Sequence, residues 1–285
     1  MSLPTISVIT PTFNGAAYLE DAILSVRRQG NAAEHIVIDG ASSDGTIGLL
    51  KQHAHLRWLS EPDGGQSDAI NKGFLMAAGD LVGWLNADDY YLPGGLAAIA
   101  QAAERHPEAD VIYGDCIFVD AAGRIVRSKV EHEFDPNVLL YFGCYIPSTS
   151  TFFRRRLIER GLLLDREYRV AMDFEFFARL ARLGCRFQYV PQFIAAFRWH
   201  EDNVSLRNVQ RRAEERRRVQ RATIGHEQPP WRLETLRYLA RGRRLLRKVA
   251  SGNIAREAHI RHRRGFDTRW MHSPELPQWQ DLPSW

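Results

Sequence analysis

Short apolar runs alternate with helix-forming segments through the first 105 residues, and this alternation constrains the fold more than any other feature of the chain. The apolar runs, each bounded by turn-forming residues, cover 6–10, 35–40, 56–60 and 81–85. Helical periodicity or capping residues follow each run, at 18–26, from 46, at 66–78 and at 96–105. Strands that alternate with helices pair in parallel. We therefore predict a doubly wound α/β sheet.

The fourth run, LVGWLNADDYYLPGG at 81–95, ends in two adjacent carboxylates, Asp88 and Asp89. Ligands of open α/β sheets bind beyond the carboxyl ends of the strands, and carboxylates there suit Mg²⁺ or Mn²⁺ on phosphates. Asp also turns chains and caps helices, so the spacing alone leaves both interpretations open. Polar residues also close the other strands, and this convergence favours a binding edge; they are Thr12, Asn14, Asp39 and Asp63.

Cysteine content and hydropathy indicate the compartment. The three cysteines, Cys116, Cys144 and Cys185, are isolated and odd in number, which argues against a disulfide framework or a CxxC metal site. Residues 1–4 lead straight into a strand pattern, and no apolar stretch has transmembrane length. We expect a cytoplasmic protein that associates with the inner face of the cell membrane.

The net charge of +4 conceals an uneven distribution. Residues 206–285 contain 19 of the 38 lysines and arginines but 8 of the 34 acidic residues, a net charge of +11 that leaves −7 for residues 1–205. A basic tail on a mildly acidic domain indicates an anionic partner, either lipid headgroups or nucleic acid.

Three stretches resemble, in order, the family 2 glycosyltransferases of the GT-A fold. They are SVITPTFNGAAYL at 7–19, VIDGASSDGT at 37–46 and the NADD at 86–89 before YYLPGG. Members of that family transfer a sugar from a nucleotide donor with inversion at the anomeric carbon. The likeness extends from residue 6 to residue 205, and the ordered set of motifs is specific, whereas a lone pair of aspartates would not be.

By this resemblance, four residues hold the nucleoside: Pro11, Thr12, Phe13 and Asp39. A carboxylate can accept a hydrogen bond from the imide N–H of uracil or thymine, whereas cytosine has no such donor at that position. A UDP- or dTDP-sugar donor is therefore expected, although Asp39 can instead cap the following turn.

The segment EPDGGQSDAINKG at 61–73 would extend the nucleotide pocket. Many relatives carry an arginine in this helix, and this chain has Asp68, Asn71 and Lys72 instead. We expect Asp68 and Lys72 to bind the donor, although Lys72 can equally be an exposed helix lysine.

The family's DxD motif corresponds to 86–89, with Asn86 in place of the first carboxylate. The resemblance implies that Asn86 and Asp88 contact the donor's ribose, that Asp89 binds the metal, and that His200 matches the C-terminal histidine ligand of many GT-A enzymes. The expected cofactor is Mn²⁺ or Mg²⁺, because waters and phosphate oxygens can complete the shell of either ion and imidazole is an acceptable ligand of Mn²⁺.

The stretch YRVAMDFEFFARLARLG at 168–184 predicts a buried helix with Asp173 at its beginning. The family's catalytic base matches Asp173, and Met172 replaces the other acid of the pair. A carboxylate in a partly apolar setting can take the proton of an attacking hydroxyl. Helix capping is the alternative for Asp173, and Glu175 is the second candidate for the base.

We expect a catalytic domain at 1–205, with a nucleotide-binding half at 1–115 and an acceptor half at 116–205, and a basic helical extension at 206–285. Two amphipathic helices are predicted at 207–221 and 231–249, and an irregular segment at 273–285. Residues 206–250 can lie on an anionic membrane. They can equally pack on the catalytic domain or on the second subunit of a homodimer.

The sequence thus predicts an inverting, metal-dependent glycosyltransferase that acts on a glycan or lipid-linked acceptor in surface polysaccharide or glycolipid assembly. A nucleotidyltransferase that forms sugar nucleotides is an alternative, but it would need a Gly-rich phosphate loop with basic residues near the first strand, which residues 10–19 lack. A nucleic-acid-binding protein is a second alternative; it would leave the carboxylates unexplained, and we expect no nucleic-acid partner.

Overall fold

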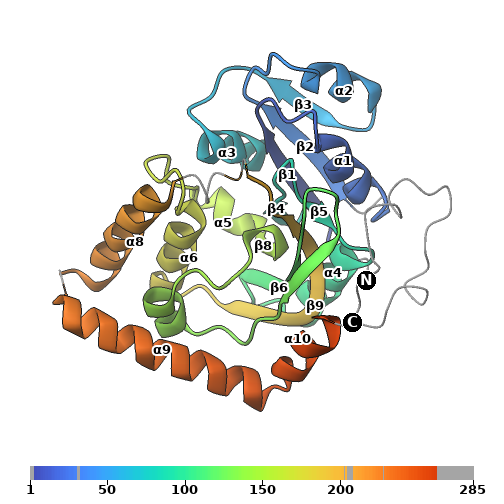
Figure 1. Cartoon of the computed structure of the whole chain (residues 1–285). Helices are drawn as coiled ribbons and strands as arrows, with labels where there is room; N and C mark the ends of the chain where they lie inside the picture. The colour runs from blue at the N-terminus through green and yellow to red at the C-terminus, as the bar shows by residue number, and fades with distance from the viewer. Residues whose placement is uncertain (1–2, 31–32, 202, 204–207, 227, 262–285) are drawn as a thin grey trace.

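The structure is a computed structural model that describes residues 3–30, 33–201, 203, 208–226 and 228–261. Within these residues a nine-stranded sheet runs in the order β3-β2-β1-β4-β8-β6-β9-β5, with β7 paired to β6 (Figure 1). The strands are β1 (Ile6–Thr12), β2 (Ala33–Asp39), β3 (Arg57–Ser60), β4 (Leu81–Trp84), β5 (Tyr90–Tyr91), β6 (Val111–Val119), β7 (Ile125–Lys129), β8 (Thr151–Arg154) and β9 (Phe187–Arg198).

The four strands predicted from apolar runs are present as β1 to β4, and they pair with one another in parallel. Helices follow them in the predicted order: α1 (Leu19–Arg27), α2 (Thr46–Gln52), α3 (Gln66–Met76) and α4 (Gly95–Arg105). The predicted α/β fold with a mostly parallel sheet is confirmed. The division expected at 115/116 falls inside β6, so both halves share one sheet.

Helices cover both faces of this sheet because neighbouring strand residues point to opposite sides. Val8 of β1 belongs to one core cluster with Ile99 of α4. Ile9, the next residue, belongs to another cluster with Phe74 of α3 and Phe177 of α6 (Met172–Arg182). The alternation along β1 therefore builds two hydrophobic layers, one on each face.

Strand β8 lies antiparallel between β4 and β6, and the sequence did not predict it. Its apolar core is only two residues, Phe152 and Phe153, and the arginine run that follows begins α5. Gly83 of β4 admits its approach, because a Cβ there would lie 2.7 Å from the Phe152 ring. Trp84 stacks on Phe153 with ring centroids 5.6 Å apart. Long-range packing rather than local pattern therefore specifies this strand.

Helices form most of the described chain after residue 130. They are η1 (Val138–Phe142), η2 (Ser148–Ser150), α5 (Arg155–Glu159), α6, α8 (Val209–Ile224), α9 (Pro230–Ala250) and α10 (Asn253–Arg261). The helical extension is confirmed: α8 packs on α6, α9 on η1, and α10 on β7. The irregular segment predicted at 273–285 lies outside the described residues.

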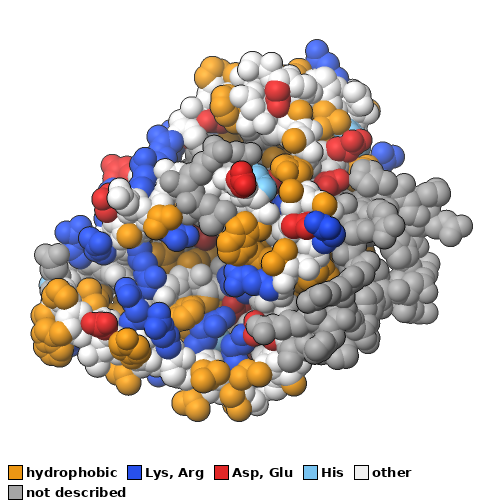
Figure 2. All heavy atoms as spheres, in the orientation of Figure 1, with side chains coloured by type: hydrophobic (Ala, Val, Ile, Leu, Met, Phe, Trp, Pro, Cys, Tyr) orange, Lys and Arg blue, Asp and Glu red, His pale blue; other side chains and the backbone are white. Residues whose placement is uncertain are grey.

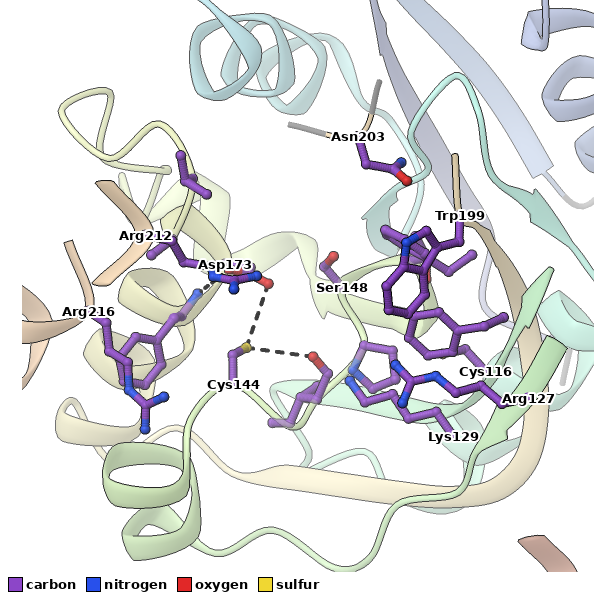
Figure 3. Close-up of a pocket in the computed structure, with 18 residues that line it drawn as sticks. Cys116, Arg127, Lys129, Cys144, Ser148, Asp173, Trp199, Asn203, Arg212 and Arg216 are labelled. Atoms are coloured by element: carbon purple, nitrogen blue, oxygen red, sulfur yellow. Dashed lines mark hydrogen bonds between the residues drawn. The ribbon is translucent and has the colours of Figure 1, made fainter. Parts of the chain in front are cut away.

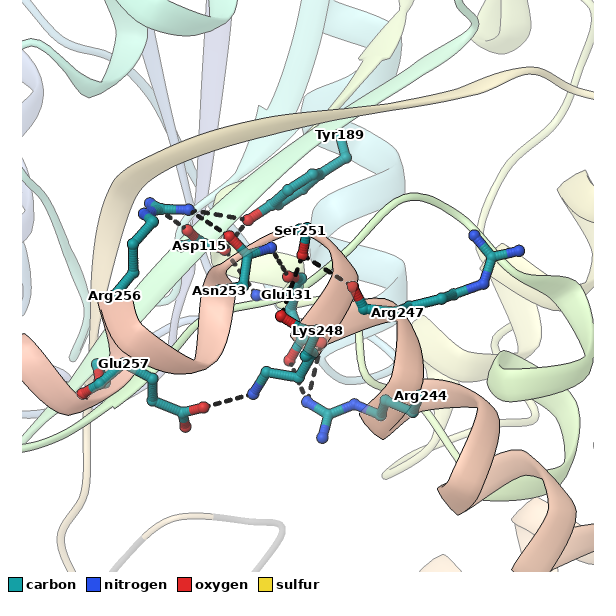
Figure 4. A network of polar contacts seen from close by, with 11 residues as sticks. Asp115, Glu131, Tyr189, Arg244, Arg247, Lys248, Ser251, Asn253, Arg256 and Glu257 are labelled. Carbon is teal, nitrogen blue, oxygen red and sulfur yellow. Dashed lines mark hydrogen bonds and ion pairs between the residues drawn. The ribbon is translucent and has the colours of Figure 1, made fainter.

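Buried ion pairs attach α9 and α10 to the sheet (Figure 4). Asp115 and Glu131, both fully buried, pair with Arg256 at 2.9 Å and Arg244 at 3.0 Å. Arginines of the extension therefore face the catalytic domain. This arrangement agrees with the alternative in which the extension packs on that domain.

The opposite side of α9 is apolar and exposed. Trp231, Leu239 and Leu246 are 69%, 64% and 70% exposed, and hydrophobic side chains gather along the lower edge of the view where α9 runs (Figure 2). No helix in the described part of the chain is long and apolar enough to cross a membrane.

Candidate active site

A cavity of about 910 Å³ opens beyond the carboxyl ends of β1 and β4. Segments far apart in the sequence line it, from the loops after β1 and β4, the start of α3, the start of α6 and the end of β9. Seven of the site residues predicted from the sequence line this cavity: Pro11, Thr12, Phe13, Asn86, Asp88, Asp173 and His200.

The two adjacent aspartates after β4 point in different directions. Asp88 lines the cavity and is 26% exposed through its side chain. Asp89 is fully buried, and its two oxygens accept hydrogen bonds from the Arg198 backbone N–H at 2.9 Å and the Asn86 side chain at 2.8 Å. Burial and the neighbouring Asp88 charge raise the pKa of Asp89 well above its usual range. A carboxyl group held in this way is poorly placed to bind a metal.

His200 lies against Asp88, not Asp89, with Nε2 and Oδ2 2.9 Å apart. Asn203 donates to the same Oδ2 at 3.2 Å. The other ring nitrogen of His200 is buried and has no hydrogen-bond partner among the described residues. One carboxylate and one imidazole that converge at a cavity fit Mn²⁺ or Mg²⁺, provided phosphate oxygens and waters complete the shell. No group of three or more His, Cys, Asp or Glu side chains suited to a metal occurs in the described part of the chain.

Arg198 supports this turn, and sequence reasoning missed it. Its guanidinium, 2% exposed, donates to the Asp88 carbonyl at 2.9 Å and to the Asp21 carboxylate of α1. In the sequence, Arg198 is marked only by its position two residues before His200. That position indicates a role at the site only once the burial of its side chain is known. Asn203 and Arg169 also line the cavity and were not predicted.

At the end of the cavity where the nucleoside was expected, the lining carboxylate is Asp63 and not Asp39. Asp39 is fully buried and accepts hydrogen bonds from the Ser42 backbone N–H at 3.0 Å and the Ser60 hydroxyl at 2.6 Å, and it does not line the cavity. Asp63 does line it, and its Oδ1 accepts a hydrogen bond from the Gly65 N–H at 2.7 Å. The role expected for Asp39 remains a prediction.

Thr12 and Phe13 present different groups at the same end. The Thr12 hydroxyl is buried without a hydrogen-bond partner in the described residues, and the Phe13 side chain is 68% exposed. Both groups lie at the cavity wall.

Asp68 and Lys72 lie behind the cavity wall, not on it. Asp68 accepts a hydrogen bond from the Gly64 N–H at 2.8 Å and pairs with Arg166 at 2.9 Å. Lys72 pairs with Glu61 at 2.6 Å. Both side chains bind the loop at 61–65, so direct contact with the donor stays a prediction for each.

Asp173 begins α6 and is common to two cavities. Its Oδ1 accepts a hydrogen bond from the Phe174 N–H at 2.7 Å, and the Cys144 thiol lies 3.6 Å from Oδ2 (Figure 3). Burial raises the pKa of Asp173, and the Phe174 N–H, the Lys129 charge and the Cys144 thiol oppose this rise. Glu175 instead pairs with Arg179 at 2.7 Å and lines neither cavity.

The second cavity, of about 330 Å³, adjoins the first at Asp173. Ser148 and Thr149 of η2 line it. One half-buried carboxylate, Asp173, thus lies where the two cavities adjoin.

Comparisons of the sequence give consistent results. Residues 7–162 match the family model described as Glycosyl transferase family 2. An uncharacterized glycosyltransferase of Mycobacterium tuberculosis is 34% identical over 188 residues, which cover 63% of this chain and 70% of the relative. A PGL/p-HBAD biosynthesis glycosyltransferase of Mycobacterium bovis is 32% identical over 183 residues, 62% of this chain and 69% of the relative.

Solved structures show the same fold at low sequence identity. Residues 1–349 of S. aureus TarS in complex with UDP-GlcNAc superpose with a TM-score of 0.63 at 19% identity, over 82% of this chain and 70% of that TarS fragment. The mannosyltransferase PcManGT of Pyrobaculum calidifontis, in complex with GDP-Man and Mn²⁺, gives a TM-score of 0.61 at 19% identity, over 91% of this chain and 81% of PcManGT.

Proposed function

The chain belongs to glycosyl transferase family 2, and from this premise we propose that it transfers a sugar from a UDP- or dTDP-sugar to a hydroxyl acceptor with inversion at the anomeric carbon. The observation that carries the proposal is the position of Asp173 between two cavities, one of which also contains Asp88 and His200. A donor in the larger cavity and an acceptor in the smaller one would meet at this carboxylate.

Asp173 acts as the base in this mechanism. The acceptor oxygen forms a bond to the anomeric carbon as the bond from that carbon to the diphosphate oxygen breaks on the opposite face, and Asp173 takes the hydroxyl proton. A half-buried carboxylate whose pKa is raised by desolvation accepts that proton more readily than a fully exposed aspartate would. The attack from the side opposite the leaving group accounts for inversion.

Asp88 and His200 would hold the divalent ion in this proposal, with Asp89 behind them. The ion would neutralise the charge that builds on the leaving diphosphate. The convergence of His200 on Asp88 supports this choice over the sequence-based assignment of Asp89. Arg198 keeps Asp88 at the cavity by binding its carbonyl.

The nucleoside would lie at the end of the cavity formed by Thr12, Phe13 and Asp63. The exposed Phe13 ring can stack on a base, and the unpartnered Thr12 hydroxyl can bond to the nucleoside. The imide N–H of uracil or thymine can donate to a carboxylate, which Asp63 supplies at the wall. Guanine can also donate to a carboxylate, so the nucleotide has to be measured.

The acceptor class is proposed from the relatives and from α9. One group of relatives is named for PGL/p-HBAD biosynthesis, and the exposed apolar side of α9 suits an interface between water and lipid. We expect a hydroxyl of a glycan or of a lipid-linked acceptor, reached with α9 resting on the membrane surface.

Calorimetric titration of UDP, dTDP, GDP and CDP, with Mn²⁺ and then with EDTA, tests the donor site. UDP or dTDP should bind in a metal-dependent way, and Asp88→Asn and His200→Ala should each weaken that binding at least about tenfold. If metal-dependent nucleotide binding is retained in Asp88→Asn but lost in a folded Asp89→Asn protein, Asp89 and not Asp88 would be assigned as the metal ligand. Failure of all four nucleotides to bind would refute the donor site.

Turnover of the donor that binds, followed as release of its nucleoside diphosphate, tests the base. Asp173→Asn should lower kcat by about a thousandfold while nucleotide affinity is retained. Glu175→Gln, two residues along α6, is the matched control and should stay near the wild-type rate. Unimpaired turnover by Asp173→Asn would exclude this residue as the base.

A further inference from the structure

The smaller cavity beside Asp173 has a strongly basic wall. Two of its cationic side chains, Arg127 and Lys129, come from β7 on one side (Figure 3). Two more, Arg212 and Arg216, come from α8 on the other side. Asp173 is the one acidic residue among the described residues that line it. The cavity therefore carries excess positive charge at the place where the proposed mechanism needs the acceptor.

None of these four cations pairs with a carboxylate among the described residues. Arg127 lies over the Phe118 ring at 4.0 Å from its centroid. Arg216 donates to the carbonyls of Tyr141 at 2.9 Å and Phe142 at 2.6 Å, and its Nε is buried without a hydrogen-bond partner. The charge of Lys129 acts on the carboxylates of Glu131 and Asp173. Four cations against one lining carboxylate still leave excess positive charge, which an anion in the cavity would neutralise.

Some other cations in the same part of the chain do pair with carboxylates. On α8, Arg211 pairs with Glu215 at 2.8 Å and Arg218 pairs with Glu167. On α9, Arg244 pairs with Glu131. What distinguishes the cavity is that four cationic side chains from two elements meet there with one carboxylate.

Aromatic side chains form another part of this wall. Phe118 contacts both Phe197 and Trp199, with ring centroids 5.3 Å and 5.6 Å away respectively. Aromatic faces pack against the apolar faces of polyol rings, and arginine forks match the oxygens of a phosphate. Together these groups fit a hydroxylated ring that bears a phosphate.

We propose that the acceptor is a polyol or sugar that carries a phosphate ester close to the hydroxyl to be glycosylated. This inference rests on the proposed function, because it assigns the smaller cavity to the acceptor. Arg212 and Arg216 on one side, and Lys129 on the other, bind the phosphate and hold the ring so that its hydroxyl reaches Asp173. The phosphate comes either from a soluble ester or from a lipid-linked one.

Binding of defined probes to the protein saturated with UDP and Mn²⁺ tests the proposal, since saturation keeps the probes out of the donor cavity. Glucose 6-phosphate represents the soluble source and is compared with glucose. Vesicles of phosphatidylinositol in phosphatidylcholine represent the lipid source and are compared with phosphatidylcholine alone. At least one phosphorylated probe should bind at least tenfold more tightly than its uncharged counterpart, and the arm that responds identifies the source.

Arg212→Gln and Lys129→Met should each lower the affinity for the responding probe by about tenfold. Arg217→Gln, an exposed arginine of the same helix that does not line the cavity, is the control and should leave the affinity unchanged. These substitutions come from opposite sides of the cavity, so failure of one variant to fold leaves the other as a test.

Equal binding of phosphorylated and uncharged probes, or unchanged affinity in both variants, would overturn the proposal. So would a matching loss of UDP affinity in Arg212→Gln and Lys129→Met, because the cations would then serve the donor diphosphate. Metal-dependent UDP binding and its loss in Asp88→Asn do not depend on this outcome, so the proposed function can stand if the phosphate site fails.

Discussion

Two acidic side chains in the first turn of α6 have very different surroundings. Asp173 is half-buried at the cavity wall, contacts the Phe174 N–H and the Cys144 thiol at hydrogen-bond range, and has a pKa raised by desolvation. Glu175 is held by Arg179 one turn away on the helix. Solvation and contacts, not residue type, therefore distinguish the proposed base from its neighbour.

The pH dependence of turnover should report on Asp173. The base works when ionised, so kcat should fall as the pH drops through the pKa of Asp173, and this acidic limb should lie above the value of about 3.9 for an exposed aspartate. Cys144→Ala removes the thiol that helps to lower this pKa, so it should move the limb to higher pH. The measurement is a pH profile of kcat for nucleoside diphosphate release.

Cys185→Ala is the matched control, because Cys185 is also partly buried but does not contact Asp173. Its limb should coincide with that of the wild-type protein. A limb that stays in place in Cys144→Ala, or that moves to lower pH, would contradict the assignment of the limb to Asp173.

At the scale of elements, α9 and α10 are held by charge as much as by apolar contact. Glu131 and Asp135 are fully buried and receive Arg244, Arg243 and Arg247 from α9. Burial raises the pKa of Glu131, whereas hydrogen bonds from Arg243 and the Val138 N–H outweigh burial and lower the pKa of Asp135. Arginines of these helices therefore neutralise the charge of buried carboxylates of the catalytic domain.

Arg244→Ala should lower the free energy of unfolding by about 3 kcal/mol, because it leaves Glu131 buried and unpaired. Urea denaturation followed by circular dichroism measures the loss. Arg232→Ala, an exposed arginine at the start of the same helix, should change stability by less than about 0.5 kcal/mol. Equal effects of the two substitutions would show that the pair with Glu131 contributes nothing specific.

At the scale of the whole molecule, α9 presents an apolar stripe to the outside. Its exposed members recur at helical spacing along the outer side: Trp231, Tyr238, Leu239, Leu245, Leu246 and Val249. An exposed stripe of this length indicates an interaction surface, and we propose that a membrane covers it.

Leu239→Glu combined with Leu246→Glu should weaken binding to vesicles of phosphatidylglycerol and phosphatidylcholine at least about tenfold, since each leucine contributes roughly 1.5–3 kcal/mol when buried in lipid. Co-sedimentation measures the binding, which should also fall with added salt. Leu183→Glu, an exposed leucine after α6, should have little effect. Unchanged vesicle binding, together with a dimer that dissociates in the double variant on ultracentrifugation, would assign the stripe to a homodimer instead.

The order of elements and the edge of the sheet at which the cavity lies could be predicted from the sequence alone. Hydrophobic periodicity depends on local spacing, so β1 to β4 and their helices follow directly from it. Parallel strands bring their carboxyl ends to one edge, so the convergence of Thr12 and Asp88 at one cavity follows as well. These conclusions need only near-neighbour pattern and general topology.

Only the tertiary structure decided which side chains reach the cavity. Asp88 reaches it and Asp89 does not, because the backbone of Arg198, 109 residues further along the chain, binds Asp89. The orientation of α9 about its axis is decided in the same way. Arg244 faces the catalytic domain because it pairs with Glu131, and Leu246 is therefore exposed. Adjacent residues share the same local sequence, so the side to which each points is set by partners that are distant in the chain and close only in the folded protein.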